Sequence, residues 1–85
     1  MPKFIDHHRG LNLTQENISQ SRAMIQSGTA TEGGVKAFNG FSSADGKEAW
    51  CYVEAPNAAA VRQLHEHFYG LKGEEVQVTE VQSLV

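Results

Sequence analysis

The segment 35–54, VKAFNGFSSADGKEAWCYVE, decides the fold of this chain. Residues 35–41 and 48–54 are two stretches of strand-favouring residues, and the second contains a Trp, a Tyr and a Val. Between them, residues 43–46 (SADG) have the composition of a hairpin turn, in which Gly supplies a positive φ. The segment therefore predicts two consecutive strands in the middle of the chain.

A helix is predicted on each side of this hairpin. Thr14 has the side chain of a helix N-cap, and the helix that it begins is expected to run to about Ser27 and to stop at Gly28. Asn57 is a second N-cap, and its helix is expected to continue to about Tyr69 and to end at Gly70. The second helix has the clearer apolar stripe, formed by Ala58, Val61, Leu64 and Phe68.

Residues 3–8 and 76–81 complete the pattern as outer segments of strand character. The order strand, helix, strand, strand, helix, strand predicts an α+β fold of the ferredoxin-like βαββαβ kind. Residues 1–85 are expected to form one such domain, a four-stranded antiparallel sheet with two helices on one face. The first and third strands are expected to lie together in the centre, parallel to each other.

The composition excludes several classes of protein. The net charge is −3 and the seven Lys and Arg residues are scattered, so a nucleic-acid partner is not expected. No apolar run approaches the roughly 20 residues of a membrane span, and the N-terminal residues lack the apolar core of a signal peptide. Cys51 is the single cysteine, so no intrachain disulfide forms. These features predict a cytoplasmic protein that does not insert into membranes.

The sheet face without helices is expected to carry large aromatic side chains. Alternation along the third strand places Cys51 toward the helices and Trp50 and Tyr52 on the open face. Two exposed aromatic side chains on a bare sheet favour a homodimer or a cavity enclosed between two sheets. The alternative is that they are ordinary scattered surface aromatics.

Four histidines in a short chain suggest a metal site, although no short metal-binding motif is present. His7 and His8 are neighbours on a strand and point to opposite faces, so one ion cannot take both. Asp6 is unexpected in the middle of a strand, where an aspartate must be paired, hydrogen-bonded or functional. Cys51 and His65 each have an alternative role, as a small buried side chain and as a hydrogen-bonded interior histidine.

The expected heights of these residues in the fold suggest two groups. With the helix rising about 1.5 Å and the strand about 3.3 Å per residue, His65 lies level with Cys51 and with Ile5 or Asp6. With the first and third strands taken as parallel, His8 and Glu54 form a separate pair at one edge of the sheet. The residues alone leave open which group, if either, binds a ligand.

Three segments together resemble a family of small bacterial ferredoxin-like domains, most without an assigned function, that includes a nickel-binding protein. The segments are residues 5–11 (IDHHRGL), 50–56 (WCYVEAP) and 61–70 (VRQLHEHFYG). The resemblance implies a homodimer with a divalent-metal site, with candidate ligands Asp6, His8, Cys51, Glu54 and His65. The chain departs from the family pattern at Arg22 and Tyr69, where members often have a His.

Three functions are therefore compatible with the sequence. The first is a dimeric protein that binds Ni²⁺ or a similar ion through thiolate, imidazole and carboxylate groups. The second is a small oxygenase or isomerase of the dimeric α+β barrel type, in which Asp6 and His8 act as an acid–base pair. The third is a protein-interaction module without a metal, in which the histidines are structural.

Overall fold

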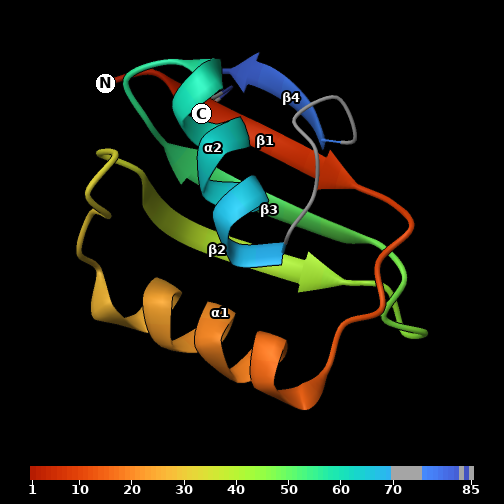
Figure 1. The fold of residues 1–85 in the computed structure, drawn as a ribbon. Helices are drawn as coiled ribbons and strands as arrows, with labels where there is room; N and C mark the ends of the chain where they lie inside the picture. Colours follow the sequence, from red (N-terminus) through yellow and green to blue (C-terminus); the bar gives the residue numbers. More distant parts are fainter. Residues whose placement is uncertain (70–75, 83, 85) are drawn as a thin grey trace.

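The computed structural model describes residues 1–69, 76–82 and 84, except for the side chains of 67–69, and it contains the predicted order of elements. The elements are β1 (Lys3–His8), α1 (Gln15–Ser27), β2 (Lys36–Ser42), β3 (Ala49–Glu54), α2 (Ala58–Tyr69) and β4 (Val76–Val81). In Figure 1, α2 lies over β1 and β3, while α1 lies along β2. The predicted α+β, ferredoxin-like arrangement is confirmed.

The strands form one sheet in the order β2-β3-β1-β4, and every neighbouring pair is antiparallel. The prediction that β1 and β3 run parallel was therefore wrong, although both are central. The chain reverses at α1 and again at β2, so β1 and β2 run the same way, and the hairpin then reverses β3. As a result, Lys3 is opposite Glu54, and His8 is opposite Ala49 at the other end of the pair.

The N-caps of both helices and the glycine that ends α1 are those that the sequence predicted. The Thr14 side chain accepts a hydrogen bond from the Asn17 backbone N–H, and the Asn17 side chain accepts one from the Thr14 backbone N–H. Gly28 ends α1 with φ +66°, in the left-handed region that favours glycine. Asn57 Oδ1 accepts a bond from the Ala60 backbone N–H at the start of α2.

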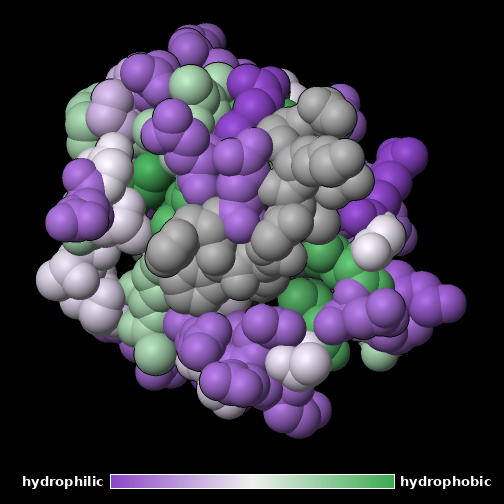
Figure 2. Space-filling view, in the orientation of Figure 1, coloured by the Kyte–Doolittle hydropathy of each residue, from purple (hydrophilic) through white to green (hydrophobic). Residues whose placement is uncertain are grey.

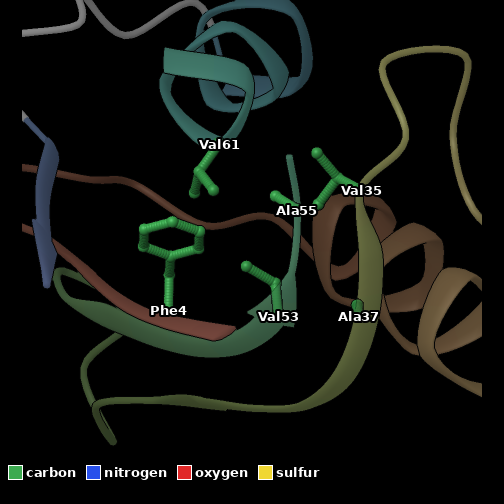
Figure 3. Packing of buried hydrophobic residues seen from close by; sticks show 6 residues of the cluster. All are labelled: Phe4, Val35, Ala37, Val53, Ala55 and Val61. Carbon is green, nitrogen blue, oxygen red and sulfur yellow. The ribbon is translucent and has the colours of Figure 1, made fainter. Parts of the chain in front are cut away.

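The hydrophobic core lies between the sheet and α2. Figure 3 shows the Phe4 ring of β1 beneath Val61 of α2 and beside Val53 of β3. Val35 and Ala55 extend this cluster toward α1, and both are at most 1% exposed. Every second residue of β1 is buried, which fixes the face of the sheet that meets the helices. Hydrophilic residues cover most of the described part of the helix-bearing face (Figure 2).

The opposite face of the sheet carries aromatic side chains. The Trp50 ring stacks on His7 with the ring centroids 4.8 Å apart, and the Tyr52 ring lies beside Phe38. Ile5 and Phe41 are 41% and 65% exposed. The sequence prediction for Trp50 and Tyr52 agrees with the strand register, which pairs them with His7 and Ile5 of β1.

No helix among the described residues has both the length and the apolar character needed to cross a membrane. The predicted helix end at Gly70 and the side chains of Phe68 and Tyr69 lie outside what the structure describes.

Candidate metal centre

Two strands bring the first three polar groups of the candidate site together. Asp6 and His8 alternate with more exposed residues of β1, so both side chains point toward the helices, and each is 0% exposed. Cys51 is opposite Asp6 in the β1–β3 register and points to the same face. A carboxylate, an imidazole and a thiol therefore meet beneath the helical layer.

The fourth group comes from α2. His65 is 3% exposed, and its Nδ1 lies 2.7 Å from the carbonyl oxygen of Val61, one turn earlier. A carbonyl only accepts, so Nδ1 carries a proton and donates it to Val61. The other ring nitrogen, Nε2, is thereby directed at Asp6, and the His65 ring packs edge-on against the His8 ring at 4.4 Å.

Both imidazoles converge on one oxygen of Asp6. His8 Nε2 donates to Asp6 Oδ1 at 2.8 Å, and His65 Nε2 lies 3.3 Å from the same oxygen. The second carboxylate oxygen, Oδ2, is buried and has no hydrogen-bond partner among the described residues. A buried carboxylate oxygen without a partner is unfavourable in a protein interior, and it leaves ligand capacity at this point.

The contact between His65 and Asp6 requires a positive charge. Since Nδ1 of His65 already holds a proton, a neutral His65 would face Asp6 Oδ1 with the lone pair of Nε2. Two lone pairs that face each other across 3.3 Å repel, unless a cation lies between them. A proton on Nε2 satisfies the pair, and so does a metal ion.

The pKa shifts in the cluster follow from the same geometry. Burial alone favours the neutral forms, but the hydrogen bonds and charges shared between Asp6 and His65 outweigh it. The pKa of Asp6 is consequently lowered and that of His65 is raised. Burial, and then the Asp6 carboxylate, raise the pKa of Cys51 above its ordinary value, so without a metal this residue is a thiol.

The donor atoms lie close enough to share one ion. One ligand atom from each of Asp6, His8, Cys51 and His65 can be chosen so that all lie within 4.8 Å of one another. Ligands around a tetrahedral ion with bonds of about 2.0–2.3 Å are roughly 3.3–3.8 Å apart, so small side-chain rotations close the remaining difference. These residues fit a metal ion in donor chemistry and in spacing.

The structure brings four of the five candidate residues together and places the fifth elsewhere. Glu54 is opposite Lys3, three residues along β3 from Cys51, at the far end of the strand from His8. The expected edge pair of His8 and Glu54 is therefore not formed. It depended on the parallel pairing of β1 and β3. His7 faces the other side of the sheet, where Glu48 Oε1 lies 3.1 Å from its Nε2.

One contributing residue was not singled out by the sequence analysis as part of the site. Val61 orients His65 through its backbone carbonyl, and its side chain is a fully buried member of the core. The only sequence signal for this role is the separation of four residues along α2, which places the two residues on one helix face. Orientation of a histidine ligand by a carbonyl acceptor is common in metal sites.

A cavity of about 450 Å³ lies between α1 and the β2–β3 pair, and Cys51 lines it. It is on the helix-bearing side of the sheet. Trp50, Tyr52 and His8 do not line it, so it is not the open-face cavity that the enzyme alternative requires. Cys51 belongs both to the lining of this cavity and to the candidate metal centre.

The fold and the cluster together describe a small α+β domain with a buried group of metal-type ligands. A solved structure with a similar fold is that of SCO4226 from Streptomyces coelicolor A3(2), at a TM-score of 0.65 and 23% identity. The alignment covers 95% of this chain and 99% of that one. No family model and no curated protein matches the sequence. The comparison shows the fold.

Proposed function

We propose that this protein binds one divalent transition-metal ion per chain through Asp6, His8, Cys51 and His65. The observation that carries the proposal is the convergence of the four donor atoms within 4.8 Å. The Asp6 Oδ2 atom, buried without a hydrogen bond to the described residues, and the lone-pair conflict between His65 and Asp6 support it, because a bound cation relieves both. Glu54 is left out of this ligand set.

The donor set selects a class of metal ion. Ca²⁺ and Mg²⁺ prefer oxygen ligands, whereas imidazole and thiolate suit ions such as Ni²⁺, Co²⁺, Cu²⁺ and Zn²⁺. An ionised Asp6 and Cys51 supply two negative charges, so a divalent ion with two neutral imidazoles gives a complex without net charge. This balance matters because an uncompensated charge in such a buried place is costly. Nickel is the ion that the sequence resemblance favours.

We also propose that the protein is a homodimer that meets its copy through the open sheet face. Ile5, Phe38 and Phe41 are exposed on or beside this face, next to the partly buried Trp50 and Tyr52. A contiguous group of exposed apolar and aromatic side chains is typical of an interaction surface.

Because Cys51 binds metal only as a reduced thiolate, the proposed compartment is the cytoplasm.

The metal proposal is tested with tag-free, metal-stripped protein. Calorimetric titration with Ni²⁺, and separately with Zn²⁺, is expected to show saturable binding of one ion per chain. Ni²⁺ or Co²⁺ is also expected to produce a thiolate-to-metal charge-transfer absorption band, which Cys51→Ser abolishes. The band is the sharper measurement, because it reports a bond to sulfur rather than binding alone.

The neighbouring histidines of β1 give a matched pair of variants. His8→Gln removes a donor of the cluster and is expected to weaken binding by at least about tenfold, as loss of ligand or orienting groups does in other sites. His7→Gln makes the same chemical change on the opposite face and should bind as the wild type does. Absence of saturable binding, or an intact charge-transfer band in Cys51→Ser, would refute the proposed site.

A further inference from the structure

The cavity between α1 and the β2–β3 pair has the dimensions and the lining of a small-molecule site. Its volume of about 450 Å³ lies within the range of roughly 300–1,000 Å³ that is common for ligand pockets. Its wall is mostly apolar, with Leu13, Ile18 and Ile25 on the helical side and Ala49 and Cys51 on the sheet side. A smaller number of polar side chains interrupts this wall, as in other pockets that orient a ligand.

Arg22 is the charged residue of this wall. Among the residues that the structure describes, no Asp or Glu lines the cavity and no ion pair includes Arg22. This is notable in a protein with a net charge of −3, where acidic groups outnumber basic ones. Polar groups of Gln26, Asn39 and Ser42 also line the cavity. Arg22 is exposed to solvent, and its guanidinium, which has no carboxylate partner among the described residues, is suited to an anionic group of a ligand that enters the mostly apolar cavity.

At Gly40, α1 approaches the sheet closely. A Cβ atom added there would lie 3.3 Å from Ile25 Cδ1 and 3.6 Å from Cys51 Sγ. The position has no positive φ, so its backbone accepts an L side chain, but a Cβ atom 3.3 Å from Ile25 Cδ1 would require the Ile25 side chain to shift. The surface that Gly40, Ile25 and Cys51 present to the cavity consists of a backbone methylene, a methyl group and a sulfur atom, and it suits an apolar group of a ligand.

We infer that this cavity binds a small amphipathic carboxylate. The carboxylate group pairs with Arg22, and the hydrocarbon part lies along Leu13, Ile18 and Ile25 toward Gly40. The inference depends on the cavity and on the Arg22 cation, and it does not require the metal ion. It assigns this part of the molecule a ligand class that the candidate metal centre does not explain.

The test uses octanoate as the probe, below its micelle-forming concentration, and octanamide as its neutral counterpart. The protein is metal-stripped and kept in a chelator, so the result is independent of metal binding. A titration followed by ¹H–¹⁵N NMR is expected to show saturable shifts in α1, β2 and β3 with octanoate. Octanamide is expected to bind more weakly by about tenfold, since a charge-assisted hydrogen bond contributes roughly that factor.

Three variants complete the test. Arg22→Gln is expected to weaken octanoate binding by about tenfold, whereas Arg62→Gln, the same change on α2, leaves it unchanged. Gly40→Val is expected to weaken octanoate and octanamide alike, because its side chain displaces Ile25, which lines the cavity. Circular dichroism checks that each variant is folded. The inference is overturned if octanoate does not saturate, if octanamide binds equally well, if Arg22→Gln has no effect, or if the shifts map to the open sheet face.

Discussion

Replacing Asp6 with Asn is the sharpest single perturbation of the proposed metal centre. Asn has nearly the shape of Asp, but it removes the negative charge on which His8 and His65 converge. With Asp6 and Cys51 ionised, a divalent ion and two neutral imidazoles form a neutral complex. In Asp6→Asn, the same complex keeps one uncompensated positive charge among side chains that are at most 3% exposed, Cys51 aside.

The magnitude follows from the cost of such a charge. Removal of one partner from a buried ion pair costs about 3–5 kcal/mol, and 1.4 kcal/mol corresponds to a factor of about ten in affinity. The affinity for Ni²⁺ should therefore fall by at least about 100-fold in Asp6→Asn. The metal-free protein should lose only about 1–3 kcal/mol of stability, because His65 can release its proton when the carboxylate is gone.

Competition with a chromophoric chelator at neutral pH measures the affinity, and urea unfolding of the metal-free variants measures the stability. Glu54→Gln is the matched control, because it also removes one negative charge but lies about 10 Å along β3 from Cys51. At that separation the charge of the partly exposed Glu54 is largely screened, so the change should stay within about twofold. A folded Asp6→Asn variant that binds Ni²⁺ nearly as tightly as the wild type would refute the reasoning. So would an equal loss in Glu54→Gln.

Three further predictions concern pH, assembly and the core. The raised pKa of His65 stabilises the folded, metal-free protein fully below the unfolded value of 6.5, and this contribution is lost as the pH rises through the folded pKa. The Tm of metal-stripped protein should therefore fall over that pH range, and it should fall less in His65→Gln. The increase in Tm on addition of Ni²⁺ should become larger over the same range. A Tm that rises with pH in the absence of metal would contradict this reasoning. Phe41 is 65% exposed, and Phe41→Ser should convert the proposed dimer to a monomer in analytical ultracentrifugation without loss of helix content. An unchanged mass would argue against a dimer formed through the open face. Val61→Ala should cost about 2–3 kcal/mol in urea unfolding, because Val61 is fully buried against Phe4; a cost below about 1 kcal/mol would mean that the core adjusts to fill the space.

The features of the fold that could be predicted are those that neighbouring residues determine. Thr14 and Asn57 act as N-caps because their side chains reach the backbone N–H groups of the following turn. Gly28 and Gly46 adopt positive φ angles that end a helix and close a hairpin. These interactions span only a few residues, so sequence alone contains the necessary information.

The direction of the β1–β3 pairing was the error with the largest consequence. The order of elements already contains the answer, because the chain reverses between successive elements, and three such reversals separate β1 from β3: β1 to α1, α1 to β2, and β2 to β3. Taking the two strands as parallel moved Glu54 next to His8. The antiparallel register instead places Asp6 opposite Cys51, which makes Asp6 the member of β1 level with the thiol.

The candidate site was predictable where a residue conflicts with its local environment. Asp6 is disfavoured in the middle of a strand, and the structure buries it completely between two histidines. The roles of the Val61 carbonyl and of the cavity beside Cys51 were not predictable in this way. They depend on how closely α2 and α1 pack against the sheet, and no pattern of a few residues specifies that distance.

The cluster also indicates how a small domain can keep a buried carboxylate without a bound metal ion. The proton on His65 Nε2 occupies the place between His65 and Asp6 that the proposed ion would take, so the metal-free site retains a positive charge beside the carboxylate. Metal and proton then compete for the same lone pairs, and Cys51 must lose its own proton when the ion binds. The proposed site therefore predicts that a rise in pH favours uptake of the ion and that acidification favours its release. The hydrogen bond from His65 Nδ1 to the Val61 carbonyl leaves Nε2 as the nitrogen that either the proton or the proposed ion takes.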